Sequence, residues 1–200
     1  EHQLPGGPGV GAGVDPHAHH RAMLAKPRAG EGESTQIKLH DLELVNQDGN
    51  WVKFASEVIG DRIVMVDFVY TTCTTVCPVL SAIFGQVQGR LGQRAGRDVY
   101  LVSVSVDPNR DTPPRLKAYA SRYKAGPGWT WLTGEKQIVD EVLIGLGAYT
   151  PNFEDHPSMV LVGDGRSGVW KRFFGFPGPD QILAAVDELM AARQAVTAME

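Results

Sequence analysis

Cysteine is nearly absent from this chain. Only two of its 200 residues are cysteines, Cys73 and Cys77, and they are separated by Thr74, Thr75 and Val76. A disulfide between residues so close in sequence would close a very short loop, which would stabilise a domain of this size little. We therefore exclude a disulfide framework as the source of stability and interpret the two thiols as functional residues.

The chain also lacks an excess of positive charge and any long apolar run. Its formal net charge is -4 and it has no basic stripe, which argues against a nucleic-acid partner. No apolar run reaches the roughly 18 residues that a membrane-spanning helix needs. Because residue 1 is neither a methionine nor the start of a signal peptide, we expect a trimmed or mature form.

Large apolar residues are rare before residue 35, where Gly, Pro, Ala and His dominate. This composition predicts a flexible segment over residues 1–34, suited to a stalk between a membrane anchor and a folded domain. His17, His19 and His20 lie together within it, and three imidazoles so close in sequence could bind Cu(II), Ni(II) or Zn(II). The alternative is that the tract is histidine-rich by composition alone.

Residues 35–196 are expected to form one domain, since 42% hydrophobic content suffices for one core and not for two. Apolar and polar residues alternate over Thr35–Val45, Asp48-Gly49 is a turn signal, and Trp51–Phe54 follows as a second strand. An N-terminal β-hairpin is therefore predicted. Strands and helices then alternate, and two strands and a helix close the chain. The expected strands are 63–70, 98–106, 129–132, 158–162 and 169–174, with helices from Pro78, from Pro113, over 138–146 and from about Pro179.

This order of elements predicts an α/β protein with parallel strands joined by right-handed crossovers. The closing strand pair and final helix are typical of a thioredoxin-like fold. The two cysteines then lie where the buried strand Ile63–Tyr70 meets the helix that Pro78 opens. Backbone N–H groups and the helix dipole favour a thiolate at that position. A thiolate is the form that attacks disulfides and that binds soft metals.

His156 is a candidate third residue of the same site. It precedes Pro157 and the expected strand 158–162, and the loop before this strand faces the cysteine helix in a thioredoxin-like sheet. A proline there is commonly cis, which would turn the preceding residue toward the sulfurs. We therefore expect His156 within ligand distance of Cys73 and Cys77. The alternative is a loop histidine hydrogen-bonded to its surroundings.

Two thiolates and one imidazole are a coherent set for a soft metal, and they favour copper over zinc. Structural zinc requires four protein ligands, whereas Cu(I) accepts three and Cu(II) could also be held. Asp155 or Glu154 could add an oxygen ligand for zinc, so both metals remain open from the residues alone. The same thiols could instead perform thiol–disulfide exchange, which competes with metal binding because an oxidised pair offers no thiolates.

The sequence resembles the Sco (SCO1/SenC) family of copper-binding assembly proteins over roughly residues 35–190. The residues that carry the resemblance are Asp67–Pro78 with its Cys-x-x-x-Cys-Pro motif, Ser103–Pro108, Asp111–Pro113, Leu116–Tyr119 and Asp155–His156. The resemblance implies a thioredoxin-like fold and copper bound by Cys73, Cys77 and His156. Pro157 and the tract His17–His20 depart from the family pattern. Asp107 and Asp111 match the acidic loop of the family, where they either form a turn and cap a helix or contact a partner.

The resemblance also implies a role in assembly of the CuA centre of cytochrome c oxidase subunit II. The protein would deliver copper as a metallochaperone, or would reduce the cysteines of the copper-receiving protein as a thiol–disulfide reductase with Cys73 and Cys77 as its redox-active pair. An extracytoplasmic location, in the bacterial periplasm and tethered by an N-terminal membrane segment, is implied as well. A thiol peroxidase is a third, weaker hypothesis. It would need an arginine beside the attacking cysteine, and no arginine is near Cys73 in the sequence.

Overall fold

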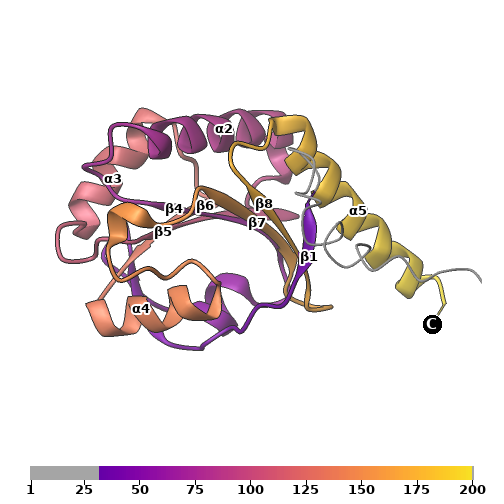
Figure 1. The fold of residues 1–200 in the computed structure, drawn as a ribbon. Helices are drawn as coiled ribbons and strands as arrows, with labels where there is room; N and C mark the ends of the chain where they lie inside the picture. Colours follow the sequence, from indigo (N-terminus) through magenta and orange to yellow (C-terminus); the bar gives the residue numbers. More distant parts are fainter. Residues whose placement is uncertain (1–31, 200) are drawn as a thin grey trace, which may run out of the picture.

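A computed structural model describes residues 32–199, which form one eight-stranded mixed sheet with helices on both faces (Figure 1). The strands are β1 (Glu33–Thr35), β2 (Glu43–Asn46), β3 (Trp51–Lys53), β4 (Ile63–Val69), β5 (Val99–Ser105), β6 (Trp129–Thr133), β7 (Met159–Asp164) and β8 (Val169–Phe174). The helices are η1 (Phe54–Ile59), α2 (Val76–Leu91), η2 (Gly92–Arg94), α3 (Pro113–Arg122), α4 (Lys136–Gly145), η3 (Phe153–Asp155) and α5 (Pro179–Thr197). The strand order is β1-β8-β7-β4-β5-β6-β2-β3.

β4 is the centre of this sheet, and all seven of its residues are buried. It pairs in parallel with β5 and antiparallel with β7. Alternate β4 residues belong to two apolar clusters, because side chains of a strand point to opposite faces. Ile63, Met65 and Val69 pack with α2, α3 and α5, whereas Val64, Val66 and Phe68 pack with η1 and α4. Cover on both faces explains why β4 is apolar at every position except Asp67.

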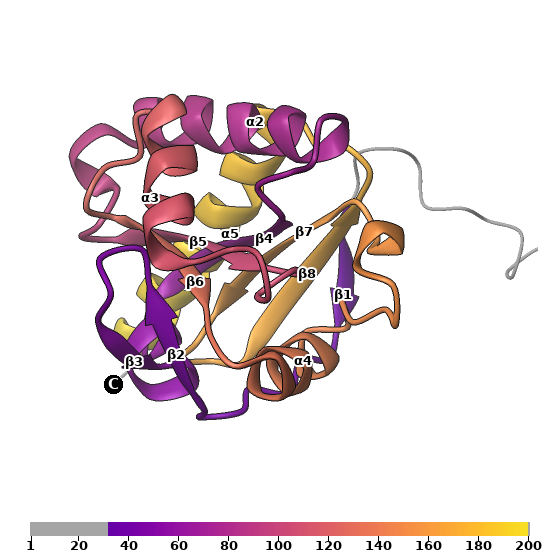
Figure 2. The ribbon, with the colours of Figure 1, turned by 90° about the vertical axis from the view of Figure 1, so that its left-hand side faces the viewer.

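The helices that cover the two faces are separated clearly in the views of Figures 1 and 2. α2, α3 and α5 lie over one face, and α4 lies under the other. The parallel strands β4, β5 and β6, followed by antiparallel β7 and β8, confirm the predicted α/β, thioredoxin-like fold. The helix predicted to open at Pro78 begins at Val76 instead, so Cys77 lies inside its first turn.

The predicted N-terminal hairpin is present, but it is shorter than expected. β2 and β3 pair around a turn in which Gly49 adopts a φ of +82°. Val45 and Asn46 of β2 then pair with β6. Residues 36–42 are not a strand, and Phe54 begins the π-helix η1 rather than extending β3. Phe54 is fully buried, so the chain turns inward at this residue.

The start of the domain is anchored at the opposite edge of the sheet. β1 pairs antiparallel with β8, so Glu33 and Ser34 belong to the sheet, although the sequence places them in the flexible segment 1–34. Residues 1–31 of that segment lie outside the described residues, and so does the tract His17, His19 and His20. Over residues 32–199, none of the helices combines the length and apolar content that crossing a membrane requires.

Asp164 fixes the last helix to the sheet. It ends β7, is 2% exposed, and accepts hydrogen bonds from Arg193 of α5 at 2.9 and 2.6 Å. The Arg166 backbone N–H also donates to Asp164. Burial opposes ionisation of this carboxyl, but the Arg193 guanidinium outweighs burial and lowers the pKa of Asp164 below 3.8. A carboxyl with a lowered pKa stabilises the fold above its ordinary pKa, and the stabilisation is lost as pH falls through the folded value.

We expect Asp164→Asn to lower the free energy of unfolding by about 1.5–3 kcal/mol at pH 7, the usual range for hydrogen bonds to charged groups. The difference from the parent should shrink as pH falls below about 4. Urea unfolding at pH 7 and at pH 3 measures both values. The control is Asp180→Asn, which removes the exposed pair with Arg90 and should cost less than about 1 kcal/mol. A loss that is unchanged at pH 3 would contradict the role of the Asp164 charge.

Candidate functional site

The two sulfurs lie at the junction between β4 and α2, as the sequence predicts. Cys73 sits in the turn that follows β4, where its backbone N–H donates to the Tyr70 carbonyl at 3.0 Å. Cys77 lies in the first turn of α2, and its backbone N–H donates to Cys73 Sγ at 3.5 Å. Both cysteines are free and buried, at 6% and 0% exposure. The Cys73 sulfur therefore sits at the amino end of the helix, where a thiolate is stabilised.

The two thiols differ in acidity because they differ in burial and in the direction of their hydrogen bond. Burial opposes ionisation of Cys73, but hydrogen bonds from the Cys77 thiol and from the Cys77 and Thr75 N–H groups lower its pKa to about 7. Burial, followed by the hydrogen bond to Cys73, raises the pKa of Cys77 well above its ordinary value. Near neutral pH, Cys73 is thus the more readily ionised of the two thiols, and Cys77 keeps its proton.

His156 approaches Cys77 from the other side of the site. Its Nε2 lies 4.0 Å from Cys77 Sγ, whereas no hydrogen bond joins it to Cys73 in the described part of the chain. β7 and β4 are antiparallel, so the start of β7 lies beside the carboxyl end of β4. His156 lies three residues before Met159, the first residue of β7, and this pairing carries it to the cysteine junction.

The prediction of a cis peptide bond between His156 and Pro157 is wrong. Every peptide bond within residues 32–199 is trans. The ring reaches Cys77 because His156 follows the short helix η3 in an extended conformation, at φ −58° and ψ 141°. Nδ1 lies 3.3 Å from the Pro157 carbonyl. The tautomer that donates this hydrogen bond leaves the Nε2 lone pair facing the sulfur.

Aromatic rings shield this imidazole from water. The Tyr70 ring contacts His156 edge-on with centroids 5.8 Å apart, and Phe153 packs against Tyr70 at 5.1 Å. His156 is only 7% exposed. Burial, opposed by the Pro157 carbonyl, lowers the pKa of His156 below 6.5. The imidazole is therefore neutral at pH 7, which is the form that binds a metal.

The three predicted ligands are not preassembled. Within residues 32–199, no three His, Cys, Asp or Glu side chains are already grouped so that they could hold a metal ion. Glu154 and Asp155, which could have supplied an oxygen ligand for zinc, are both exposed. Asn152 accepts a hydrogen bond from the Glu154 backbone and donates to Asp155. These two carboxylates therefore do not complete a four-ligand site.

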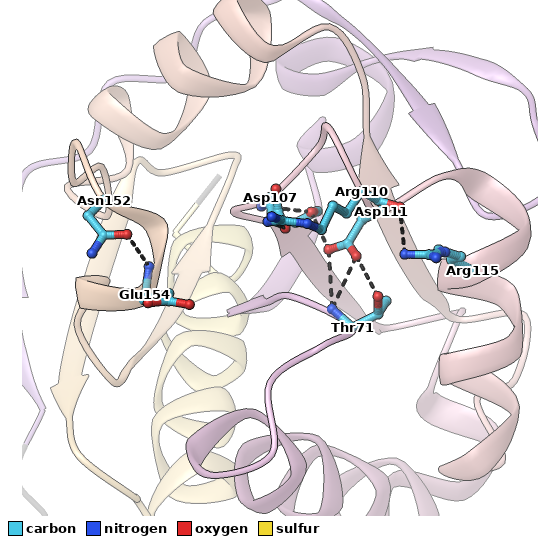
Figure 3. A network of polar contacts seen from close by, with 8 residues as sticks. Thr71, Asp107, Arg110, Asp111, Arg115, Asn152 and Glu154 are labelled. Atoms are coloured by element: carbon cyan, nitrogen blue, oxygen red, sulfur yellow. Dashed lines mark hydrogen bonds and ion pairs between the residues drawn. The ribbon is translucent and has the colours of Figure 1, made fainter.

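Figure 3 shows the acidic loop between β5 and α3, whose role the sequence left open. Asp107 pairs with Arg110 at 3.0 Å. Asp111 does not cap α3, whose first residue follows Thr112 with no side-chain cap. Instead it accepts hydrogen bonds from Thr71, two residues before Cys73, and from Ser105. No sequence spacing indicates this contact, because 40 residues separate Thr71 from Asp111.

Sequence reasoning also missed a buried carboxyl near the sulfurs. Asp67 is fully buried in β4, accepts a hydrogen bond from Ser103, and leaves Oδ2 without a partner among the described residues. Ser103 in turn accepts from the Trp129 indole at 2.9 Å. Burial raises the pKa of Asp67 to about 7, although the hydrogen bond from Ser103 opposes this shift. The sequence signal that could have indicated this buried carboxyl is the presence of an acidic residue, Asp67, inside an otherwise apolar strand.

The unequal thiols make a prediction about chemical modification. Iodoacetamide should label Cys73 before Cys77, with a rate that rises through a midpoint near pH 7, because the thiolate is the reacting form. Peptide mass spectrometry after quenched labelling measures the rate at each cysteine. Cys77→Ser should retain labelling at Cys73. Faster labelling of Cys77 would contradict the assignment of the nucleophile.

Several proteins of known structure share this arrangement of strands and helices. BsSco, described as a member of the Sco family of cytochrome c oxidase assembly proteins with a disulfide switch, matches with a TM-score of 0.66 and 26% identity. That match covers 79% of this chain and 96% of BsSco. Bradyrhizobium japonicum ScoI, solved with copper bound, matches with a TM-score of 0.59 and 25% identity over 78% of this chain and 98% of ScoI.

Sequence comparison agrees with the structural comparison. The SCO1 protein homolog of Bacillus subtilis is 37% identical over 93 residues, which cover 46% of this chain and 47% of that protein. The chain thus spans about half the length of the first curated relatives it matches. The model of the SCO1/SenC family matches residues 31–191. The chain therefore belongs to the SCO1/SenC family.

Proposed function

We propose that this protein binds one copper ion between Cys73, Cys77 and His156 and acts as a metallochaperone. The recipient would be the CuA site of cytochrome c oxidase subunit II. The observation that carries the proposal is the 4.0 Å separation of Cys77 Sγ and His156 Nε2. This separation is long for a hydrogen bond, but it is close to the span of two ligands on one metal ion.

The expected span follows from ordinary bond lengths. Metal–sulfur and metal–nitrogen bonds of about 2.3 and 2.0 Å, at angles near 110–120°, place the two ligand atoms ~3.5–3.7 Å apart. The Cys77–His156 pair needs to close by only a few tenths of an ångström. Cys73 Sγ already lies 3.5 Å from the Cys77 backbone nitrogen. A rotation of the Cys73 side chain would then bring the third ligand to the ion.

The donor set favours copper and its later release. Two thiolates and a neutral imidazole are soft or borderline ligands that suit copper. Because Glu154 and Asp155 are exposed and do not join the group, the closed four-ligand site of structural zinc is not available from them. The copper-bound relative ScoI supports the choice of metal. Three ligands leave a position through which a recipient could take the ion.

The family also supports the proposed partner and location. BsSco is described as belonging to the cytochrome c oxidase assembly proteins, and we extend that role to this chain. We propose that it works outside the cytoplasm, in a bacterial periplasm, where residues 1–34 would connect the domain to a membrane tether. The partner is then subunit II of the oxidase or another extracytoplasmic copper protein.

A second function is favoured by the unequal thiols. In a thiol–disulfide reductase, the Cys73 thiolate would attack a partner disulfide and form a mixed disulfide, releasing the partner's other sulfur as a thiolate. Cys77, giving up its proton to the departing partner sulfur, would then attack Cys73 Sγ, break the mixed disulfide, release the partner as a dithiol and leave the oxidised Cys73–Cys77 pair. A thiol peroxidase is less well supported, because no arginine in the described part of the chain hydrogen-bonds either sulfur.

Anaerobic titration of the reduced protein with Cu(I) should give tight one-to-one binding. Cys73→Ala and Cys77→Ala should abolish it, and His156→Ala should weaken the affinity by at least about tenfold, because each change removes a ligand. Competition with a chromophoric Cu(I) chelator measures the dissociation constants. His40→Ala, a histidine outside the site, is the matched control and should bind as the parent does. If all three site variants retained parental affinity, the ligand assignment would be wrong.

The reductase function predicts a different role for His156. Reduction of a disulfide-bonded peptide that carries the cysteines of the copper recipient should need both thiols but should proceed in His156→Ala within about twofold of the parental rate, since no step requires the imidazole. Stopped-flow fluorescence of the peptide measures this rate. A rate lowered as strongly as copper affinity would argue against a separate reductase function.

A further inference from the structure

Asp111 is a buried acidic residue whose side chain accepts hydrogen bonds from Thr71, in the turn that leads to Cys73, and from Ser105, at the end of β5. Its Oδ1 accepts from the Thr71 hydroxyl at 2.6 Å and from the Thr71 N–H at 3.1 Å. Its Oδ2 accepts from the Ser105 hydroxyl at 2.7 Å. Asp111 is 1% exposed. One carboxylate thus joins the end of β5 to the segment that leads into Cys73, as Figure 3 shows for its contacts with Thr71.

Burial raises the pKa of the Asp111 carboxyl, and the hydrogen bonds from Ser105 and Thr71 are what favour its charged form. In the described part of the chain, the nearby Arg110 pairs with Asp107, and no ion pair includes Asp111. A buried carboxylate without hydrogen bonds would be strongly unfavourable, so its position is tightly fixed by Thr71 and Ser105. The same hydrogen bonds also fix the position of Thr71.

The same loop also reaches the histidine side of the site. The Arg110 guanidinium lies over the Phe153 ring with its carbon 5.7 Å from the centroid. Phe153 packs on Tyr70, and Tyr70 packs on His156. One loop, residues 107–112, therefore contacts the segments that carry both the thiols and the imidazole. It is placed to determine how these two segments lie relative to each other.

We propose that Asp111 is a positioning residue for the Cys73–Cys77–His156 site. It holds the Thr71 backbone and hydroxyl, so that the turn presents Cys73 Sγ to the amino end of α2 and beside Cys77. This inference rests on the proposed function of the site, but it goes beyond the three ligands. It assigns to the acidic loop a role in the geometry of the site rather than in capping α3.

Two substitutions weaken the contact between Asp111 and Thr71, one at the acceptor and one at the donor. Asp111→Asn replaces one acceptor oxygen by an NH₂ group, which cannot accept, so the single remaining oxygen cannot satisfy the Thr71 and the Ser105 donors at the same time. Thr71→Val keeps the backbone N–H and removes only the hydroxyl. Thr71→Ser keeps both donors and is the conservative rescue. Asp164→Asn is the matched control, because Asp164 is equally buried and hydrogen-bonded but lies at the far end of β7 and contacts α5.

Two readouts test the proposal independently. Chelator competition should show Cu(I) affinity about tenfold lower in Asp111→Asn and in Thr71→Val. Redox titration of the metal-free thiols in dithiothreitol buffers should show the thiol–disulfide equilibrium constant changed by about tenfold, equivalent to ~30 mV. The double variant should be no worse than the more affected single variant, since both remove one contact. Thr71→Ser should match the parent, and Asp164→Asn should lose stability without changing either readout.

The outcomes separate this inference from the proposed function. If the parent bound no Cu(I) but Asp111→Asn shifted the potential, the copper proposal would fail and the positioning role would stand. If the parent bound Cu(I) and both readouts of Asp111→Asn matched the parent, the positioning role would be overturned. Equal effects of Asp164→Asn, or fully additive effects in the double variant, would also overturn it, because they would indicate a general loss of stability.

Discussion

The functional geometry of this protein depends on the burial of β4 between two neighbours of opposite direction. β5 continues the parallel part of the sheet, and β7 returns antiparallel on the other side. The carboxyl end of β4 therefore meets both the helix that carries Cys77 and the loop that carries His156. A strand packed on both faces cannot slide without moving every side chain out of its cluster, so the place where the sulfurs and the imidazole converge is fixed by the core.

Burial then sets the chemistry at this junction. Cys77, which is fully buried, keeps its proton, while Cys73 has donors from the start of α2 and ionises near neutral pH. His156 is kept neutral by its aromatic surroundings. One nucleophilic thiolate, one protonated thiol and one neutral imidazole suit two kinds of chemistry. Copper binding requires the second thiol to lose its proton to the metal, and disulfide exchange requires it to attack later.

The two proposed reactions would be mutually exclusive at any moment, because both use the same pair of sulfurs. Membership of the SCO1/SenC family places the chain among proteins that include a copper-bound structure and one with a disulfide switch. The incomplete preassembly of the three ligands agrees with a site that changes between states. A rigid closed site would favour permanent retention of a metal, whereas the site proposed for this chain would close only after a movement of Cys73.

Local sequence patterns determined much of the architecture. The apolar run of β4 and the periodic face of α2 are encoded by neighbouring residues, and the cysteine junction follows from their order. The approach of His156 to the cysteines could be predicted in outline. In a thioredoxin-like sheet, the loop before this late strand faces the cysteine helix. The path of residues 36–42 and the turn inward at Phe54 could not, because they depend on packing against α4 and the second apolar cluster.

Only the tertiary structure decided how the site is supported. Asp111 meets Thr71 across 40 residues, Asp67 meets Ser103 across 36, and Tyr70 meets the ring of His156. The sequence by itself determined which residues can bind a soft metal or exchange a disulfide, since those properties belong to the side chains. The distances between them, and the pKa values of the two thiols, arise from burial and hydrogen bonds that exist only when strands distant in sequence pair.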